Sequence, residues 1–237
     1  MKEQEALLYK VIDLFAERFD KHAVLHGGMV LRVLGCERMT NDLDYVFVPF
    51  KSKKDIVSDV VTTLKQLEDA RVSYTLNSKC LRATVEAAEA RIQVEVKTAL
   101  AVPTSVVSTK DFAANYGYSA RLIPVVDYSV ALANKMAAWN ERRLIRDIYD
   151  IWFYLKIGVR PDFVTLKARL DKPQYSRLVR KTEHFQGGSV QDFFAFLNSH
   201  VQGLTDEEIS DSLSDYLSPE DIPGLAMRFR SEIAKLL

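Results

Sequence analysis

Apolar residues recur at helical spacing near the start of the chain and again through its second half, with strand-like runs between these regions. Helices show an apolar period of 3.6 residues, whereas strands show alternating or short continuous apolar runs. The strand-like runs predict strands at residues 23–25, 42–48, 71–76, 81–87, 91–98 and 121–126. The helical spacing predicts helices at residues 3–20, 29–34, 52–69, 128–141, 144–157, 161–170, 189–201, 205–216 and 219–236. Small and polar side chains at residues 103–117 favour an irregular connection.

The order of these elements indicates two regions of different class. Helices and strands alternate in the first region and end in a meander of strands, which predicts a mixed α/β sheet. The region that starts at residue 128 is wholly helical in its pattern. We therefore expect an N-terminal α/β domain at residues 1–122 and a C-terminal helical domain at residues 123–237, with the junction near residues 120–127.

A pair of glycines and a pair of aspartates stand out in the first region. Gly27 and Gly28 follow the short strand and open a helix, so backbone N–H groups there are able to approach a phosphate. Asp42 and Asp44 lie two residues apart on the next strand, and their side chains point to the same face. Adjacent carboxylates repel each other, and a bound divalent cation relieves that repulsion. A phosphate site beside a metal site indicates chemistry on a nucleoside triphosphate.

Glu95 is a candidate third carboxylate. It lies on a strand in which apolar and polar residues alternate, with Gln93, Glu95 and Lys97 on one face. If this strand lies next to the strand of Asp42 and Asp44, the three carboxylates are able to hold two Mg²⁺ ions. Such ions lie about 3.5–4 Å apart in two-metal phosphoryl transfer. The alternative is that Glu95 is a solvated side chain on an exposed sheet face.

A polar cluster lies in the helical region. Its charged residues are Lys135, Arg142, Arg143, Arg146, Asp147 and Asp150. At helical spacing, Arg143 and Arg146 are each placed to pair with an acid on the next turn. Two interpretations fit the cluster: an ordinary charged helix surface, or a triphosphate site, since a triphosphate needs fixed positive charge to offset its own.

Composition narrows the class of protein. The chain has 237 residues, of which 48% are hydrophobic, and this is enough for a substantial core. Lys and Arg together number 32, as do Asp and Glu, so any nucleic-acid binding depends on local basic patches. Two cysteines are too few for a disulfide scaffold. The charged N-terminus and the lack of an apolar run of about 20 residues favour a cytoplasmic protein without membrane contact.

Three segments together resemble the AbiEii/AbiGii toxin family of the DNA polymerase β-type nucleotidyltransferase superfamily. They are His26–Arg32, Arg38–Asp44, and Lys135 with Arg146–Asp150. The glycine pair with Asp-x-Asp is typical of the superfamily, whereas Lys135 with the Arg-Asp-x-x-Asp run is typical of this family. The resemblance covers roughly residues 20–157. Many superfamily members have Gly-Ser where this chain has Gly27-Gly28, although a second glycine is common in the family.

The resemblance implies a nucleotidyltransferase fold, with an N-terminal mixed sheet and a C-terminal helical domain. It also implies metal-assisted attack on the α-phosphate of a nucleoside triphosphate, with pyrophosphate as the leaving group and the nucleotide held between the domains. Asp42 and Asp44 would hold Mg²⁺, Lys135 would contact the triphosphate, and Asp147 would act as acid/base or orient a basic partner. The residues expected to contact the nucleotide are Gly27, Gly28, Arg32, Lys135 and Arg146.

The resemblance implies partners as well. Some members are toxins of toxin–antitoxin pairs and some add nucleotides to the 3′ end of tRNA, so we expect an RNA acceptor and a cognate antitoxin. The basic patch at residues 177–181 either contacts RNA or is a solvated face. Two other functions stay open: nucleotidyl transfer to a small molecule such as an antibiotic, and a catalytically silent nucleotide-binding module. An acidic pocket would favour the first, and intact Asp42, Asp44 and Lys135 argue against the second.

Overall fold

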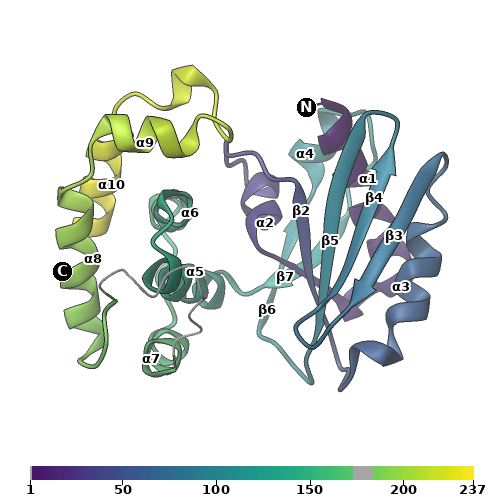
Figure 1. Cartoon of the computed structure of the whole chain (residues 1–237), viewed down its shortest axis with the longest axis horizontal. Helices are drawn as coiled ribbons and strands as arrows, with labels where there is room; N and C mark the ends of the chain where they lie inside the picture. The colour runs from purple at the N-terminus through teal and green to yellow at the C-terminus, as the bar shows by residue number, and fades with distance from the viewer. Residues whose placement is uncertain (1, 173–183) are drawn as a thin grey trace. The chain divides into compact units, whose positions relative to one another are not determined.

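The computed structural model describes residues 2–172 and 184–237, and Figure 1 shows their helices and strands. The chain divides into two compact units, Met1–Asp127 and Tyr128–Leu237. The first unit contains a sheet with helices, and the second unit is helical. The fold class predicted from the sequence, a mixed α/β sheet followed by helices, is confirmed.

The sheet of the first unit has seven strands in the order β3-β4-β5-β2-β1-β7-β6. The strands are β1 (Ala23–His26), β2 (Asp42–Phe47), β3 (Ala70–Leu76), β4 (Leu81–Ala87), β5 (Ala90–Thr98), β6 (Thr104–Ser108) and β7 (Leu122–Val126). β2 pairs in parallel with β5 and antiparallel with β1, which in turn pairs in parallel with β7. β3, β4 and β5 form an antiparallel meander. Each of the six strands that the sequence pattern predicts is therefore present.

On strands β2 to β5, one face of the sheet packs against helices, and the opposite face, called the open face below, carries mainly polar side chains. In β2, Tyr45 and Phe47 are buried, whereas Asp42 and Asp44 alternate with them and lie on the open face. Helix α1 (Lys2–Phe19) packs Phe15 against the rings of Tyr45 and Phe47. Because the apolar side chains of β2 and α1 bury each other, the two aspartates are left on the side where a ligand has access.

Residues 103–117 contain regular structure, and the prediction of an irregular connection is wrong. They include β6 and the short helix α4 (Lys110–Ala114). β6 pairs antiparallel with β7 over its whole length, which satisfies its backbone groups. The small and polar side chains of β6 give no clear strand pattern in the sequence. The strand forms through its pairing with β7, and a local pattern does not record a contact between distant segments.

The helix predicted at residues 52–69 is shorter than its apolar spacing suggests. It begins with a 3₁₀ turn at Lys53–Asp55, which Ser52 caps, and continues as α3 (Val57–Leu64). A turn follows, and Asp69 adopts a left-handed backbone with φ 55°. That conformation is unfavourable within a helix of L-residues, so the helix ends before it.

The second unit consists of helices around an aromatic core. The helices are α5 (Tyr128–Arg142), α6 (Ile145–Lys156), α7 (Phe163–Asp171), α8 (Val190–Gln202), α9 (Asp206–Leu213) and α10 (Leu225–Ala234). Trp139 of α5 packs against Phe193 of α8, and Trp152 of α6 packs against Phe229 of α10. In the described ranges 2–172 and 184–237, we find no helix that is both long and apolar enough to cross a membrane.

The last predicted helix, at residues 219–236, is interrupted. A 3₁₀ turn at Pro219–Asp221 comes first, and α10 begins only at Leu225. Gly224 lies between them in the left-handed conformation, with φ 75°, which glycine adopts without steric cost. The break therefore spans residues 222–224, where Pro223 and the left-handed Gly224 interrupt the helical spacing of the apolar residues.

Candidate functional site

The open face of the sheet brings the three predicted carboxylates onto neighbouring strands. In the parallel pairing of β2 with β5, Asp42 lies opposite Gln93 and Asp44 lies opposite Glu95. Paired residues in a ladder project to the same face, so Asp44 and Glu95 are direct neighbours across the two strands. The condition set for Glu95, that its strand lies next to the strand of Asp42 and Asp44, is met, and Figure 1 shows β2 and β5 side by side.

Gly27 makes the close approach of Asp44 possible. It has φ 80° and ψ −154°, a backbone conformation that is essentially restricted to glycine. A Cβ atom added to Gly27 would lie only 2.2 Å from Oδ2 of Asp44. The carboxylate of Asp44 therefore lies directly against the backbone of the glycine turn, as expected if metal and phosphate sites adjoin.

Gly28 is packed against a neighbouring loop. A Cβ atom at this position would lie 2.9 Å from Nη2 of Arg38 and 3.2 Å from Oγ1 of Thr40. Arg38 is itself buried, so it has little room to move away. This packing gives a physical reason why the chain has glycine where many superfamily members have serine, and it identifies Arg38 as a supporting residue that the sequence analysis did not select.

Replacing Gly27 with alanine should strongly lower nucleotidyl transfer. The methyl group would displace the carboxylate of Asp44 and also force a strained backbone, which costs about 1–3 kcal/mol. We expect a loss of transfer of at least about a hundredfold, measured with a labelled nucleoside triphosphate. Gly203→Ala is a suitable control, because Gly203 has no left-handed backbone and an added Cβ meets only ordinary contacts. Equal transfer by Gly27→Ala and wild type would show that this turn does not shape the site.

Glu95 is held by a residue that the sequence analysis did not single out, Arg82 on β4. Nη2 of Arg82 lies 2.6 Å from Oε1 of Glu95, and Nε donates to the same oxygen at 2.8 Å. Among the described residues, no group of three or more His, Cys, Asp or Glu side chains lies close enough together to hold a metal ion. The pair Asp42 and Asp44 has the hard oxygen donors that suit Mg²⁺, whereas Glu95 faces its guanidinium partner.

Arg32, which the resemblance suggested as a nucleotide contact, has structural partners. Its guanidinium forms an ion pair with Glu5 of α1 and donates to the backbone carbonyl of Cys36. The hydroxyl of Tyr116 donates to the same carboxylate. Burial and the hydrogen bond to Glu5 raise the pKa of Tyr116 above its ordinary value. These contacts tie α2 (Gly28–Val33) to α1, and a nucleotide contact by Arg32 stays a prediction.

Lys135 of α5 is fixed by an acid of α6 in the helical unit. Its Nζ lies 2.5 Å from Oδ2 of Asp150, whose side chain is only 1% exposed. The side chain of Lys135 is 17% exposed, so the ammonium group keeps some access to solvent. A lysine held in one position near the surface is suited to contact a phosphate, since little side-chain entropy remains to be lost.

Asp147 is fully buried and bound by Arg142. The guanidinium is bidentate, with Nε and Nη2 lying 2.6 Å and 2.5 Å from the two carboxylate oxygens. The hydrogen bond to Asp147 raises the pKa of Arg142. Of the two roles implied for Asp147, this geometry favours orientation of a basic partner.

The prediction that Arg143 and Arg146 pair with acids on the next turn is wrong for Asp147. Its carboxylate binds Arg142 instead. Arg143 has φ 54°, which ends α5, and its guanidinium lies 4.2 Å over the ring of Trp139. The left-handed backbone redirects this side chain away from a helical i,i+4 position. Nη1 of Arg146 lies 3.4 Å from the hydroxyl of Tyr216. Contact of Arg146 with a nucleotide remains a prediction.

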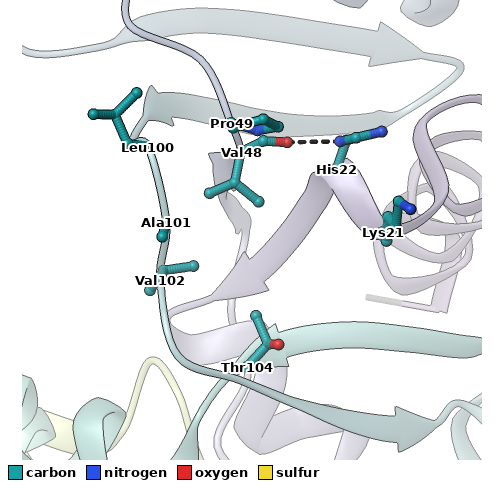
Figure 2. Close-up of a pocket in the computed structure, with 8 residues that line it drawn as sticks. All are labelled: Lys21, His22, Val48, Pro49, Leu100, Ala101, Val102 and Thr104. Atoms are coloured by element: carbon teal, nitrogen blue, oxygen red, sulfur yellow. Dashed lines mark hydrogen bonds between the residues drawn. The ribbon is translucent and has the colours of Figure 1, made fainter.

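A hollow of about 270 Å³ lies at the other ends of the central strands, and Figure 2 shows its lining. It lies where β1 begins and β2 ends, whereas Asp42 and Asp44 lie at the start of β2. The lining is mainly apolar, and Nδ1 of His22 is hydrogen-bonded to the carbonyl of Val48 at 2.7 Å. It contains no carboxylate, so this hollow is not a metal site and not the acidic pocket that would favour a cationic acceptor.

A mixed sheet with two aspartates on its open face, beside a glycine turn, is the arrangement expected of a nucleotidyltransferase. A model of the family described as "Nucleotidyl transferase AbiEii toxin, Type IV TA system" matches residues 11–219. This match spans most of the chain, so the chain belongs to the AbiEii family of nucleotidyltransferase toxins. The resemblance found in the sequence is thereby confirmed. A comparison with curated proteins found no match.

Solved structures share the fold. MenT4, the nucleotidyltransferase toxin Rv2826c from Mycobacterium tuberculosis H37Rv, has a TM-score of 0.61 and 19% identity over 98% of this chain and 82% of that chain. JHP933 from Helicobacter pylori has a TM-score of 0.56 and 14% identity over 99% of this chain and 90% of that chain. A putative nucleotidyltransferase from H. pylori has a TM-score of 0.57 and 14% identity over 99% and 93%. At such identities the likeness establishes the fold alone.

The basic patch at residues 177–181, which we expected either to contact RNA or to be a solvated face, lies outside the described residues.

Proposed function

We propose that this protein transfers a nucleotide from a nucleoside triphosphate to an RNA acceptor such as tRNA in a Mg²⁺-dependent reaction. We further propose that it acts as the toxin of a pair with a cognate antitoxin, which the description of its family supports. The observation that carries the catalytic proposal is the position of Asp44 against the backbone of Gly27, with Asp42 on the same face. A carboxylate pair for a metal thereby adjoins the turn where phosphates are expected to bind.

Asp42 and Asp44 are the residues that would hold Mg²⁺. The ion, when bound, would supply positive charge to offset the charge that develops on the reacting phosphates. In the reaction, a hydroxyl oxygen of the acceptor forms a bond to the α-phosphorus as the bond from that phosphorus to the bridging oxygen breaks. Pyrophosphate leaves with the electron pair of that bond, and the hydroxyl proton passes to a carboxylate of the open face.

The helical unit supplies positive charge in this proposal. Lys135 contacts the triphosphate, and Asp150 holds its ammonium group in position. Asp147 of α6 orients Arg142 of α5 through the bidentate contact. Arg146 is a further cation on α6. Fixed cations of this kind stabilise the transferring phosphates without reorganisation during the reaction.

The charge of the strands beside the aspartate pair favours an anionic acceptor. The charged residues that β3, β4 and β5 place on this face are Arg71, Arg82, Arg91, Lys97, Glu86 and Glu95. Four cations against two acids give these three strands a net charge of +2, which Asp42 and Asp44 on the same face bring to zero until a divalent cation neutralises them. With that cation bound, the excess is positive, so a phosphate backbone is attracted to these strands and a cationic antibiotic is repelled. The face therefore supports RNA over the small-molecule alternative.

The proposal predicts that the wild-type protein with Mg²⁺, labelled nucleoside triphosphates and total tRNA yields labelled RNA. Lys135→Ala should lower transfer by about 10- to 100-fold, because a hydrogen bond to a charged group contributes about 1.5–3 kcal/mol. Lys235→Ala is the matched control, since Lys235 pairs with Glu232 on the exposed surface of α10 and its C-cap. Gel separation of the labelled RNA measures transfer by both variants.

Loss of Lys135 also leaves the buried carboxylate of Asp150 without its ammonium partner. The double variant Lys135→Ala/Asp150→Asn removes that charge and should recover thermal stability without recovering transfer. Two results would contradict the proposal. Labelling of small cationic acceptors in place of RNA would establish the alternative acceptor class, and equal labelling by wild type and Asp44→Asn in every reaction would exclude the proposed catalytic site.

A further inference from the structure

Strands β4, β5 and β2 are adjacent in the sheet (Figure 1), and four of the charged side chains on their open face are neighbours. Arg82 lies opposite Glu95 in the pairing of β4 with β5, and Asp44 lies opposite Glu95 in the pairing of β5 with β2. Asp42 precedes Asp44 on the same face. Glu95 therefore lies between a guanidinium on one side and the aspartate pair on the other.

The contact of Arg82 is confined to one oxygen of Glu95. Both Nε and Nη2 reach Oε1, at 2.8 Å and 2.6 Å. The Arg82 side chain is 51% exposed, so it is free to swing into solvent when another cation takes its place. The hydrogen bond and charge of Glu95 raise the pKa of Arg82, and the charge of Asp42 adds a smaller contribution in the same direction.

We propose that Arg82 is a positioning residue that competes with a divalent cation for the carboxylate of Glu95. This inference rests on the proposed function, because it assigns the regulation of the proposed metal site. Without a cation, Arg82 offsets the repulsion among three neighbouring carboxylates and turns Glu95 toward β4. When the cation binds, Glu95 exchanges its guanidinium partner for the metal, and Arg82 moves into solvent.

The competition explains why the described residues contain no assembled group of three metal-binding side chains although three carboxylates share one face. The two hydrogen bonds from Arg82 hold the carboxylate of Glu95 turned toward β4, and the guanidinium charge repels a second cation there, so a divalent cation has to displace Arg82 to bring Glu95 toward the aspartate pair. The affinity of the empty protein for a cation is therefore lowered by the free energy of the Arg82–Glu95 contact. For a pair as exposed as this one, that contribution corresponds to about a two- to fivefold change in affinity.

The test measures binding of Mn²⁺ alone, without nucleotide, from the electron paramagnetic resonance signal of the free ion. Arg82→Gln should bind Mn²⁺ about two- to fivefold more tightly than wild type. Lys97→Gln is the charge-matched control, because Lys97 is an exposed cation on the same face of β5 with no such contact to Glu95. In the Glu95→Gln background, Arg82→Gln should leave Mn²⁺ affinity unchanged, since the shared carboxylate is absent.

Three results would overturn the inference: no change in affinity for Arg82→Gln, a change equal to that of Lys97→Gln, or a change that persists in the Glu95→Gln background. Nucleotidyl transfer by the wild type, measured in parallel, separates the two proposals. If transfer requires Mg²⁺ but any of these three results is found, the inference about Arg82 fails and the proposed function stands. If neither Mn²⁺ binding nor transfer is found, both fail. Because Arg82 is half exposed, we expect these variants to keep the wild-type circular dichroism spectrum.

Discussion

Asp44→Asn should lower nucleotidyl transfer by roughly a thousandfold while leaving the fold intact. Asparagine has nearly the same shape as aspartate, so it still fits against the backbone of Gly27. It lacks the negative charge that a divalent cation requires, and metal-ion stabilisation of a reacting phosphate is worth several kcal/mol, of which about 4 correspond to a factor of a thousand. The change therefore separates a chemical role of Asp44 from a structural one.

The measurement is the rate of transfer from a labelled nucleoside triphosphate under saturating Mg²⁺, with circular dichroism as the check on folding. Asp59→Asn is the matched control, because Asp59 is an exposed acid on α3, outside the open face. We expect the control to transfer at the wild-type rate. Removal of divalent cations with a chelator should lower wild-type transfer to the level of Asp44→Asn. A folded Asp44→Asn protein that transfers at more than about a tenth of the wild-type rate would contradict the metal role.

Arg142→Met should destabilise the helical unit by about 3 kcal/mol. The side chain of Asp147 is fully buried, and Arg142 satisfies both of its oxygens. Breaking such a pair leaves an uncompensated buried charge, at a cost of about 3–5 kcal/mol. The low end of that range applies here, because the side chain of Arg142 is 38% exposed and water is able to reach its vacated position.

Tryptophan fluorescence during urea unfolding measures this loss. The chain's two tryptophans, Trp139 and Trp152, both lie in the helical unit, so the signal follows the unit in which the change is made. Lys167→Met is the control, since it breaks an exposed pair with Asp171 and should cost less than about 1 kcal/mol. Arg142→Met combined with Asp147→Leu should recover most of the stability, because no buried charge remains. Equal losses for Arg142→Met and Lys167→Met would show that the buried pair is not a stabilising contact.

Most elements of the chain and the faces of its predicted strands follow from the sequence alone, because they depend on local periodicity. The alternation of apolar residues places Asp42 and Asp44 on one face of β2, and the same alternation places Glu95 on the corresponding face of β5. The family is also readable from the sequence, through the glycine pair, Asp-x-Asp and the motif around Lys135. These features need no knowledge of distant contacts.

The contacts of the charged side chains were decided only by the tertiary structure. The pattern placed Arg143 and Arg146 next to the acids of the following turn, but the left-handed residue at the end of α5 leaves Arg142 to bind Asp147. Strand β6 is identified only from its pairing with β7 in the structure.

The same holds for the aspartate site. Two contacts depend on which strands adjoin and in which register. They are the contact of Gly27 with Asp44 and the ion pair of Arg82 with Glu95. Hydrogen-bond ladders between distant segments set that register, and a period read along one segment contains no information about its partner. The sequence by itself determined that this chain has a carboxylate pair beside a glycine turn, whereas the fold decided which side chains hold those carboxylates in place.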